Sequence, residues 1–448
     1  MKFTDNVSRP SAQRIFIDNF RWTWAHRSFQ YKSAVLCTAI GIFLSVAAAL
    51  SAQEPDLVTC LSGMLSIIGL VALWQDHRHI LAEAQEFSIA PLTVDTHRKV
   101  VELAHAYGYH AGLFENRTIL FPVEANRFIR AGGLNKKQVM LETKCFQICQ
   151  EEFCRQAFEH FRRHARVVWN DSKVRLNTDP HRFKTDPEPI KLQKTTYFDY
   201  LATAFYSQRL WKYKNKVEYN GIDLMLGSNC LLPLTMVRTA HHVGVNTLLL
   251  TSNKQLLIQE TRARGAVGRY VPSGSGSLDL KDIDVRCFGQ TLLNGALREF
   301  CEETGWDELA SRRKNMQVSS EMQHYPLGMV LDASRGLVTD FFFLSVADHD
   351  THTDYLDQYR QGKVKVDDFE MPTFNAVTWI DCSACEKYED WQQHLRKLVN
   401  NYRTSDPILA VHIQLFEELL QDIESTSQHP LWKVLLGDPN RAYLNAGY

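Results

Sequence analysis

The sequence lacks an excess of charge of either sign. Its 448 residues include 50 Lys and Arg against 51 Asp and Glu, which gives a formal net charge of -1. Proteins that bind DNA or RNA directly usually carry a basic excess, so the whole chain gives no indication of direct nucleic-acid binding. Internal repeats and low-complexity tracts are also missing. With 45% hydrophobic and 23% charged residues, the composition is typical of a folded protein of two or three domains.

The ten cysteines lack the regular spacing of a disulfide framework. They are scattered over the chain, and the one CxxC pair, Cys382 with Cys385, has neither a second pair nor a histidine close in sequence. A zinc or redox site at this pair is the less favoured interpretation. The pattern is typical of a protein in a reducing compartment.

Two stretches, residues 33–53 and 57–75, lack charged residues altogether. Each is long enough to span about 30 Å of hydrocarbon as a helix, and both are rich in small residues that let helices approach closely. A cleaved signal peptide would have a shorter leader and a shorter apolar core, and two buried core helices are the remaining alternative. The stretches therefore predict a two-helix transmembrane hairpin in contact with the lipid bilayer.

Basic residues decide the expected orientation of this hairpin. They crowd the leader, residues 1–32, and recur after the second stretch at Arg78, Arg98 and Lys99. Because basic residues favour the cytoplasmic side, we expect a multi-pass protein of the cell inner membrane with both termini in the cytoplasm.

The middle region, residues 80–240, is expected to be a helical linker. Its apolar residues have helical spacing over 85–170, and proline-containing turns near 179–189 indicate a break in regular structure. It contains the aromatic and basic stretch KLQKTTYFDYLATAFYSQRLW, residues 191–211. Aromatic rings and cations of this kind can bind a nucleotide-like ligand, or the stretch can be the aromatic edge of a core. Both interpretations stay open, so the region is a candidate sensor.

The segment REFCEETGW, residues 298–306, places three glutamates within one helical turn: Glu299, Glu302 and Glu303. Their charges repel one another on one helix face, which is tolerated when a divalent cation lies between them. A solvated acidic helix end is the alternative. The surroundings predict a hairpin around 252–254, a flexible loop at VPSGSGS, a helix that ends at Gly305, and a second hairpin around 334–336.

This segment resembles the signature of the Nudix hydrolases, G-x5-E-x7-R-E-U-x-E-E-x-G-U, in which U is a bulky apolar residue. The matching residues are Arg298, Glu299, Phe300, Glu302, Glu303, Gly305 and Trp306. Gln290 stands where the family has Glu, and Asp284 stands where it has Gly. The resemblance implies an α/β fold, with a Nudix αβα sandwich over residues 243–382 and a helical tail over 383–448.

The resemblance also implies roles for individual residues. Glu299, Glu302 and Glu303 would hold Mg²⁺ or Mn²⁺, and Arg298 would orient a glutamate. Glu299 would accept the proton of the attacking water, or a later acid would do so. The candidates for that later acid are Asp367, Asp368 and Glu370. Arg262 and Arg264 would contact substrate phosphates, with simple surface solvation as an equal alternative.

A Nudix-like domain behind a membrane hairpin resembles the membrane-anchored Nudix effectors of bacterial CBASS anti-phage systems. That resemblance implies cleavage of a nucleoside-diphosphate-linked substrate, activation by a cyclic oligonucleotide from a partner synthase, and an antiviral role. Homo-oligomerisation is left open. Two alternatives remain: a Nudix domain that binds a nucleotide without cleaving it, and a nucleotide sensor that controls a membrane-disrupting hairpin.

Overall fold

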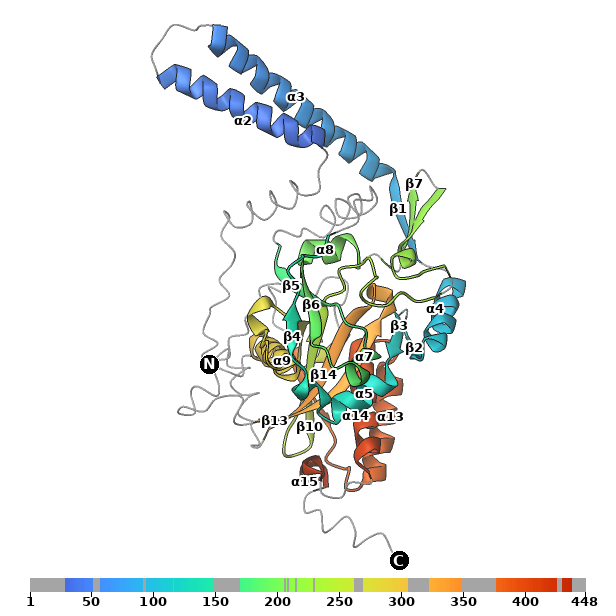
Figure 1. Ribbon diagram of the computed structural model, residues 1–448. Helices are drawn as coiled ribbons and strands as arrows, with labels where there is room; N and C mark the ends of the chain where they lie inside the picture. Colours follow the sequence, from blue (N-terminus) through green and yellow to red (C-terminus); the bar gives the residue numbers. More distant parts are fainter. Residues whose placement is uncertain are drawn as a thin grey trace, which may run out of the picture.

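The computed structural model describes most of the chain, with gaps that include residues 148–169, 262–268, 305–321 and 348–375. The described ranges are 29–50, 57–91, 94–115, 117–147, 170–204, 207, 209–213, 216–228, 230–261, 269–304, 322–347, 376–424 and 429–436. They form a helical hairpin and a mixed helix-and-sheet body (Figure 1).

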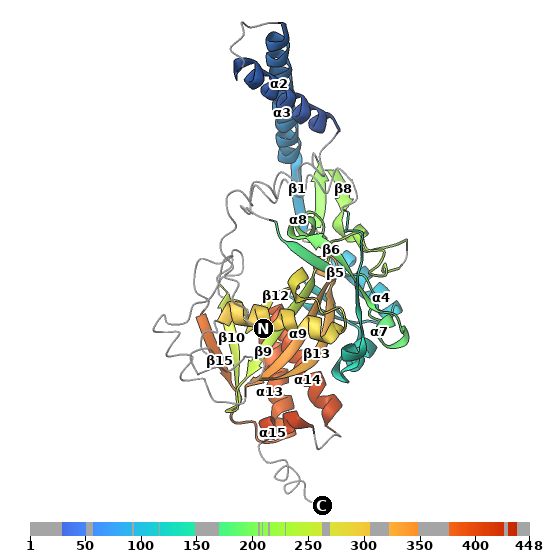
Figure 2. The same ribbon diagram turned by 60° about the vertical axis from the view of Figure 1, so that its left-hand side comes forward.

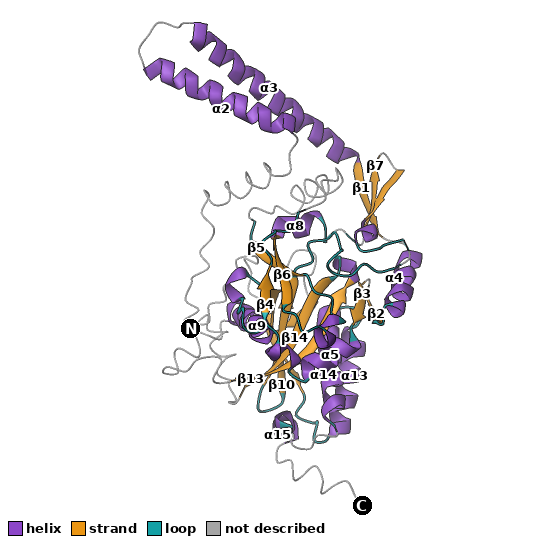
Figure 3. Cartoon of the chain, in the orientation of Figure 1, coloured by secondary structure: helices purple, strands orange, loops and turns teal. Residues whose placement is uncertain are grey.

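Two long helices form the hairpin, α2 (Phe29–Leu50) and α3 (Leu57–Glu86). Small residues bring them into close contact: the hydroxyls of Ser45 and Ser62 lie 2.9 Å apart, and a side chain at Gly41 would collide with α3. Helix α3 leads directly into strand β1 (Phe87–Pro91), and the hairpin extends away from the body (Figure 3).

The prediction of a transmembrane hairpin is overturned, because no helix in the described part of the chain combines the length and apolar character that crossing a membrane requires. Helices α2 and α3 lie where the two stretches predicted helices, with residues 51–53 outside the described residues. The assignment of these helices to a bilayer, and the inner-membrane location that followed from it, are corrected. That prediction was based on the length of the two runs, on their apolar residues and on their lack of charge. Much of each run is Gly, Ala, Ser and Thr, which here pack helix against helix, and α3 continues past Gln75 through charged residues to Glu86.

A large mixed sheet forms the centre of the body, with strand order β11-β10-β9-β14-β13-β3-β2; β12 pairs with β9 and β15 with β10. Strands β9 and β14 run parallel, and the other pairs are antiparallel. The strands are β2 (His110–Phe114), β3 (Arg117–Phe121), β9 (Val243–Leu250), β10 (Gln255–Thr261), β11 (Arg269–Pro272), β12 (Gly274–Ser277), β13 (Met322–Asp332), β14 (Val338–Ala347) and β15 (Ala376–Asp381).

Both expected hairpins are confirmed. Strands β9 and β10 meet around residues 252–254, and β13 joins β14 through the short helix η4 (Ala333–Arg335). Gly336 then takes a left-handed φ of 68°, a conformation that glycine adopts without steric cost. The prediction of a flexible loop at VPSGSGS, residues 271–277, is wrong. Those residues form the end of β11, a connecting Ser273, and all of β12.

Helices cover both faces of the sheet (Figure 2). Helix α9 (Phe288–Thr304) packs on one face with Phe341 of β14, whereas Phe342 points into the core on the other face. This alternation is expected for a strand buried on both sides. The second face holds α13 (Tyr388–Tyr402), α14 (Pro407–Ile423) and α15 (Pro430–Leu436). The predicted helical tail is therefore present as a packed layer.

The prediction that residues 85–170 are helical is wrong at 110–121 and 139–141, which form strands, and residues 148–169, most of the stretch on which it was based, lie outside the described residues. The region from 80 to 240 is mixed. It contributes β2 and β3 to the main sheet and forms two further sheets, β1-β7-β8 and β4-β6-β5. Its remaining elements are α4 (Val94–Ala106), α5 (Val123–Arg130), η1 (Gly133–Lys136), β4 (Val139–Leu141), β5 (Ser172–Leu176), α7 (Arg182–Thr185), β6 (Ile190–Thr196), α8 (Tyr197–Ala202), β7 (Arg209–Tyr213), β8 (Lys216–Asn220) and η2 (Gly221–Leu224).

The aromatic stretch at 191–211 forms β6, α8 and β7. Phe198 and Leu201 are buried, and Tyr200 is 7% exposed and contacts the His242 ring, with centroids 4.8 Å apart and planes tilted by 32°. Thr196 and Asp199 cap α8 through reciprocal hydrogen bonds, as in a capping box. Of the two interpretations left open, the packed core edge matches these side chains.

Candidate active site

Arg298 lies at the centre of the acidic cluster on α9. Its side chain is 5% exposed, and Nη1 donates to Glu299 Oε1 at 2.8 Å and to Glu302 Oε2 at 3.0 Å. On its other side Nε and Nη2 donate to the carboxylate of Asp282 at 3.0 and 2.9 Å. Burial by itself lowers the pKa of Arg298, but the charges of Glu299 and Asp282 raise it to a higher value overall. The guanidinium is therefore held charged between carboxylates.

Strand β12 supports two of the three glutamates. The carboxylate of Glu299 lies directly over Gly276, where any side chain would collide with it. Glu303 Oε2 accepts a hydrogen bond of 2.8 Å from the backbone amide of Ser275. The glycines of VPSGSGS thus let the strand and the acidic helix approach closely.

Two aspartates that the sequence reasoning missed complete the cluster. Asp282 is 2% exposed and bonds Arg298, and Asp279 lies 3.7 Å from the same guanidinium. Asp279 precedes the short helix η3 (Leu280–Asp282) and Asp282 is its last residue, and the two residues form a capping box at its start. The sequence could have indicated them, because LDLKD, residues 278–282, places two aspartates three residues apart shortly before the acidic helix.

A lysine from the middle region also reaches the site. Lys173 of β5 donates through Nζ to Asp279 Oδ1 at 2.7 Å, and the two side chains are 13% and 21% exposed. Burial lowers the pKa of Lys173, but the adjacent Asp279 raises it above its ordinary value. The contact ties β5 to the loop that holds Arg298, a juxtaposition that only the tertiary structure reveals.

We expect Lys173→Met to lower the free energy of unfolding by about 1–3 kcal/mol, because it leaves the partly buried Asp279 without its cation. Urea denaturation measures the change. The matched control is Lys281→Met, since Lys281 is 51% exposed and lies 3.9 Å from Glu302; it is expected to change the value by less than about 0.5 kcal/mol. Equal effects of the two substitutions would contradict a structural role for the Lys173 ion pair.

Negative charge exceeds positive charge within this cluster. Five carboxylates face three cations, and the members are Asp279, Asp282, Glu299, Glu302 and Glu303 with Lys173, Lys281 and Arg298. Burial raises the pKa of Glu302; Arg298 acts against this, and the neighbouring Glu299 adds to it. The surplus of hard oxygen donors suits a cation such as Mg²⁺ or Mn²⁺ in charge and in ligand type.

The side chains are not, however, gathered around one point. In the part of the chain that the structure describes, no three His, Cys, Asp or Glu side chains form a group that could hold a metal ion. The contacts explain this, because Arg298 draws Glu299 and Glu302 to itself and Ser275 holds Glu303. Side-chain rotation of the glutamates is needed before they can share a cation.

The two departures from the Nudix pattern have local roles. Gln290 is exposed and donates through Nε2 to Asn294 Oδ1 at 2.8 Å. Asp284 Oδ1 accepts from the amide of Arg286, and hydrogen bonds to Arg286 lower the pKa of Asp284. Its backbone exchanges hydrogen bonds with the hydroxyl of Thr291. Both residues thus stabilise the start of α9.

Several predicted site residues lie outside the described residues. These are Arg262 and Arg264, the later acids Asp367, Asp368 and Glu370, and the signature residues Gly305 and Trp306. The roles expected of them stay predictions.

The CxxC pair has the character of core packing. Cys382 and Cys385 are buried in the core beneath α13 and α14. Burial raises the pKa of both thiols, which disfavours the thiolate that redox chemistry and zinc binding require.

Comparison with known proteins adds no family to this picture. No protein-family model matches the chain, and no curated protein matches it significantly. The Nudix resemblance therefore rests on the residues of α9 and their surroundings.

Proposed function

We propose that the chain is a metal-dependent hydrolase that cleaves a phosphoanhydride bond in a nucleoside-diphosphate-linked substrate. The observation that supports this proposal most is the buried Arg298, which donates hydrogen bonds to Glu299, Glu302 and Asp282. The Glu299 carboxylate lies against Gly276, which has no side chain that would collide with it. A solvated acidic helix end would not bury its arginine or enclose its glutamates.

In this proposal Glu299, Glu302 and Glu303 hold the cation. When bound, it screens the diphosphate and lowers the pKa of a water molecule. Arg298 binds one oxygen each of Glu299 and Glu302 and so fixes the direction of the other oxygen. Glu299, packed over Gly276, accepts a proton from the attacking water, and Lys173 and Asp279 hold the η3 loop against Arg298.

A second candidate is a domain that binds a nucleotide without cleaving it. The observation that favours it is the absence, among the described side chains, of three ligands already gathered for a metal ion. Gln290 in place of the family's first Glu points the same way. The antiviral role and the cyclic-oligonucleotide activator were based on the combination of a membrane hairpin with a Nudix-like domain and on the stretch at 191–211. The membrane assignment is corrected, and the role and the activator stay predictions.

The test is hydrolysis by the purified full chain. It is incubated with Mg²⁺ or Mn²⁺ and a panel of nucleoside diphosphates, triphosphates, dinucleotides and nucleotide sugars, beside Glu302→Gln and Glu303→Gln. The matched control is Glu124→Gln, because the Glu124 side chain is 65% exposed on α5. We expect the two site variants to lose about 10²-fold or more in kcat and the control to match the native chain.

Each other outcome has a definite meaning. Cleavage that survives in both site variants, or that persists in excess chelator, would contradict the proposed function. Tight nucleotide binding with no cleavage under any condition would favour the second candidate.

A further inference from the structure

Small residues form the contact between the two helices of the hairpin. Among the hairpin residues whose burial is described, the buried ones are Ala34, Thr38 and Gly41 on α2 and Ser62 and Gly69 on α3. A side chain at Gly69 would collide with Thr38, so glycine lets the two backbones approach this closely. Because these residues are small, the contact between the helices buries little apolar surface.

The large apolar side chains of the hairpin point outward instead. Of the large apolar side chains that are exposed in the described part of the chain, 13 of 18 belong to α2 and α3. Phe43 is 72% exposed, and Ile67 and Ile68 are 63% and 66% exposed. Successive residues of a helix point about 100° apart, so the apolar surface covers more than one face. A helix pair that needs no partner has the opposite arrangement, with its large apolar residues between the helices.

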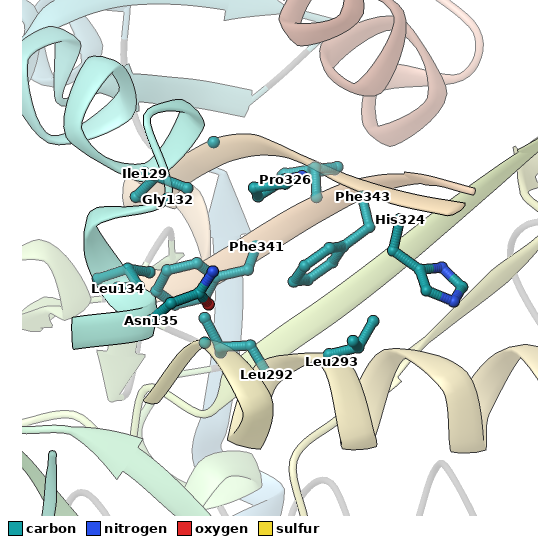
Figure 4. A pocket seen from close by; sticks show the side chains of 13 residues that line it. Ile129, Gly132, Leu134, Asn135, Leu292, Leu293, His324, Pro326, Phe341 and Phe343 are labelled. Carbon is teal, nitrogen blue, oxygen red and sulfur yellow. The ribbon is translucent and has the colours of Figure 1, made fainter. Parts of the chain in front are cut away.

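The body of the molecule keeps its large apolar residues inside, as Phe341 and Phe342 on the two faces of β14 illustrate. The hollow beside the first half of α9, lined in part by Leu293 and Phe343, is about 100 Å³ in volume (Figure 4). It is smaller than the cavity of about 150 Å³ that holds one benzene ring in an engineered protein. In the described part of the chain the exposed apolar surface is therefore concentrated on the hairpin, and a large surface of this kind marks an interaction site.

The chemistry and the size of this surface both suit a second copy of the chain. The runs 33–53 and 57–75 contain no charged residue, so identical hairpins do not repel one another, and a charged partner would find no complementary charge. The hairpin also extends away from the body (Figure 3), which leaves its faces open to another hairpin. One face of two adjacent helices of this length measures roughly 30 by 20 Å, or about 600 Å², and each partner in a standard interface buries about 800 Å².

We propose that the hairpin is a self-association surface through which copies of this chain form a homo-oligomer of at least two chains. The hairpins pack side by side and cover the outward apolar side chains, including Phe43 and Ile68; two such hairpins make a four-helix bundle. Because α3 continues directly into β1, which pairs with β7, the association also links the bodies of neighbouring copies. The proposal concerns assembly and does not depend on the chain being a hydrolase.

The test is sedimentation of the purified full chain at micromolar concentration in a buffer without detergent. The variants are Phe43→Glu and Ile68→Glu. At an exposed position the new charge costs the single chain little, but in the assembly it would be buried without a partner. The matched control is Met236→Glu, since Met236 is 62% exposed on the body. Circular dichroism of each variant verifies that the helices are retained.

We expect the native chain and Met236→Glu to sediment with one discrete mass of two or more chains. The dissociation constant should rise by about 10²-fold or more in Phe43→Glu and in Ile68→Glu. If a glutamate variant loses helix content, Ile68→Ser decides, because it removes apolar surface without adding a charge and should also weaken association.

A native chain that sediments as a monomer would overturn the proposal. Binding of that monomer to vesicles of an uncharged phospholipid would then assign the surface to lipid, and failure to bind them would assign it to residues 1–28 of the same chain. Equal association of all variants, or open-ended aggregation with no discrete mass, would also overturn it.

Discussion

Arg298→Met is expected to lower the free energy of unfolding by about 3–5 kcal/mol. The guanidinium is the common partner of Asp282, Glu299 and Glu302, and Asp282 is only 2% exposed. Removing one partner of a buried ion pair leaves the other charge uncompensated in a medium that solvates it poorly. Urea denaturation of the native chain and the variant measures the difference.

A double-mutant cycle identifies the cause. Combining Arg298→Met with Asp282→Asn removes the stranded charge, so the double variant should be more stable than the sum of the two single effects predicts. A loss below about 1 kcal/mol for Arg298→Met, or strict additivity in the cycle, would contradict the account of Arg298 as the organising residue of the cluster.

Glu299→Gln is expected to reduce kcat by about 10²–10⁴-fold, with the fall in kcat larger than any rise in KM. Glutamine keeps the size of the side chain that packs over Gly276 but can neither accept the proton nor offer a charged oxygen to a cation. The dependence of kcat on pH gives a second readout. In the native chain kcat should fall at low pH as the base becomes protonated, and this fall should be absent in Glu299→Gln.

Glu124→Gln again serves as the control, with native kcat expected. A Glu299→Gln variant within threefold of the native kcat would assign the proton to another group. The acids in 367–370 would then be the next residues to substitute.

The acidic cluster on α9 could be predicted from the sequence because it depends on spacing along one helix. Glu302 and Glu303 lie three and four residues after Glu299, and helix geometry alone brings the three to one side. The two hairpins were predictable for the same local reason: each turn sits between two apolar runs. What spacing could not show is that Arg298 binds two of the glutamates instead of leaving them to share a cation.

The middle region was mispredicted because its partners are distant in sequence. Strand β5 pairs with β6, and Lys173 reaches Asp279 more than a hundred residues later. Short strands with interspersed charges have apolar spacings that also fit a helix, so periodicity alone could not separate the two. The same limit hid the two-stranded extension of the main sheet by residues 110–121.

The hairpin shows a different limit. Its uncharged runs were correctly predicted to be helical and close-packed, and Ser45 and Ser62 meet at the interface. The error lay in treating two uncharged, apolar runs of sufficient length as membrane spans, although many of their residues are small and pack helix against helix. The glycine-rich segment before α9 was mispredicted in a related way, because Gly274 and Gly276 serve close packing of a strand on a helix and not flexibility.

The central claim is that the acidic cluster on α9 binds a divalent cation. Calorimetric titration of the metal-free full chain with Mn²⁺ tests this claim most directly. The account predicts saturable binding that is lost in Glu302→Gln and in Glu303→Gln, retained in Glu124→Gln, and weakened as the pH falls toward the raised pKa of Glu302. Protonation of a ligand competes with the cation, which gives the sign of that pH dependence. Binding that is absent in the native chain, or unchanged in both site variants, would contradict the assignment of the acidic cluster as a cation site.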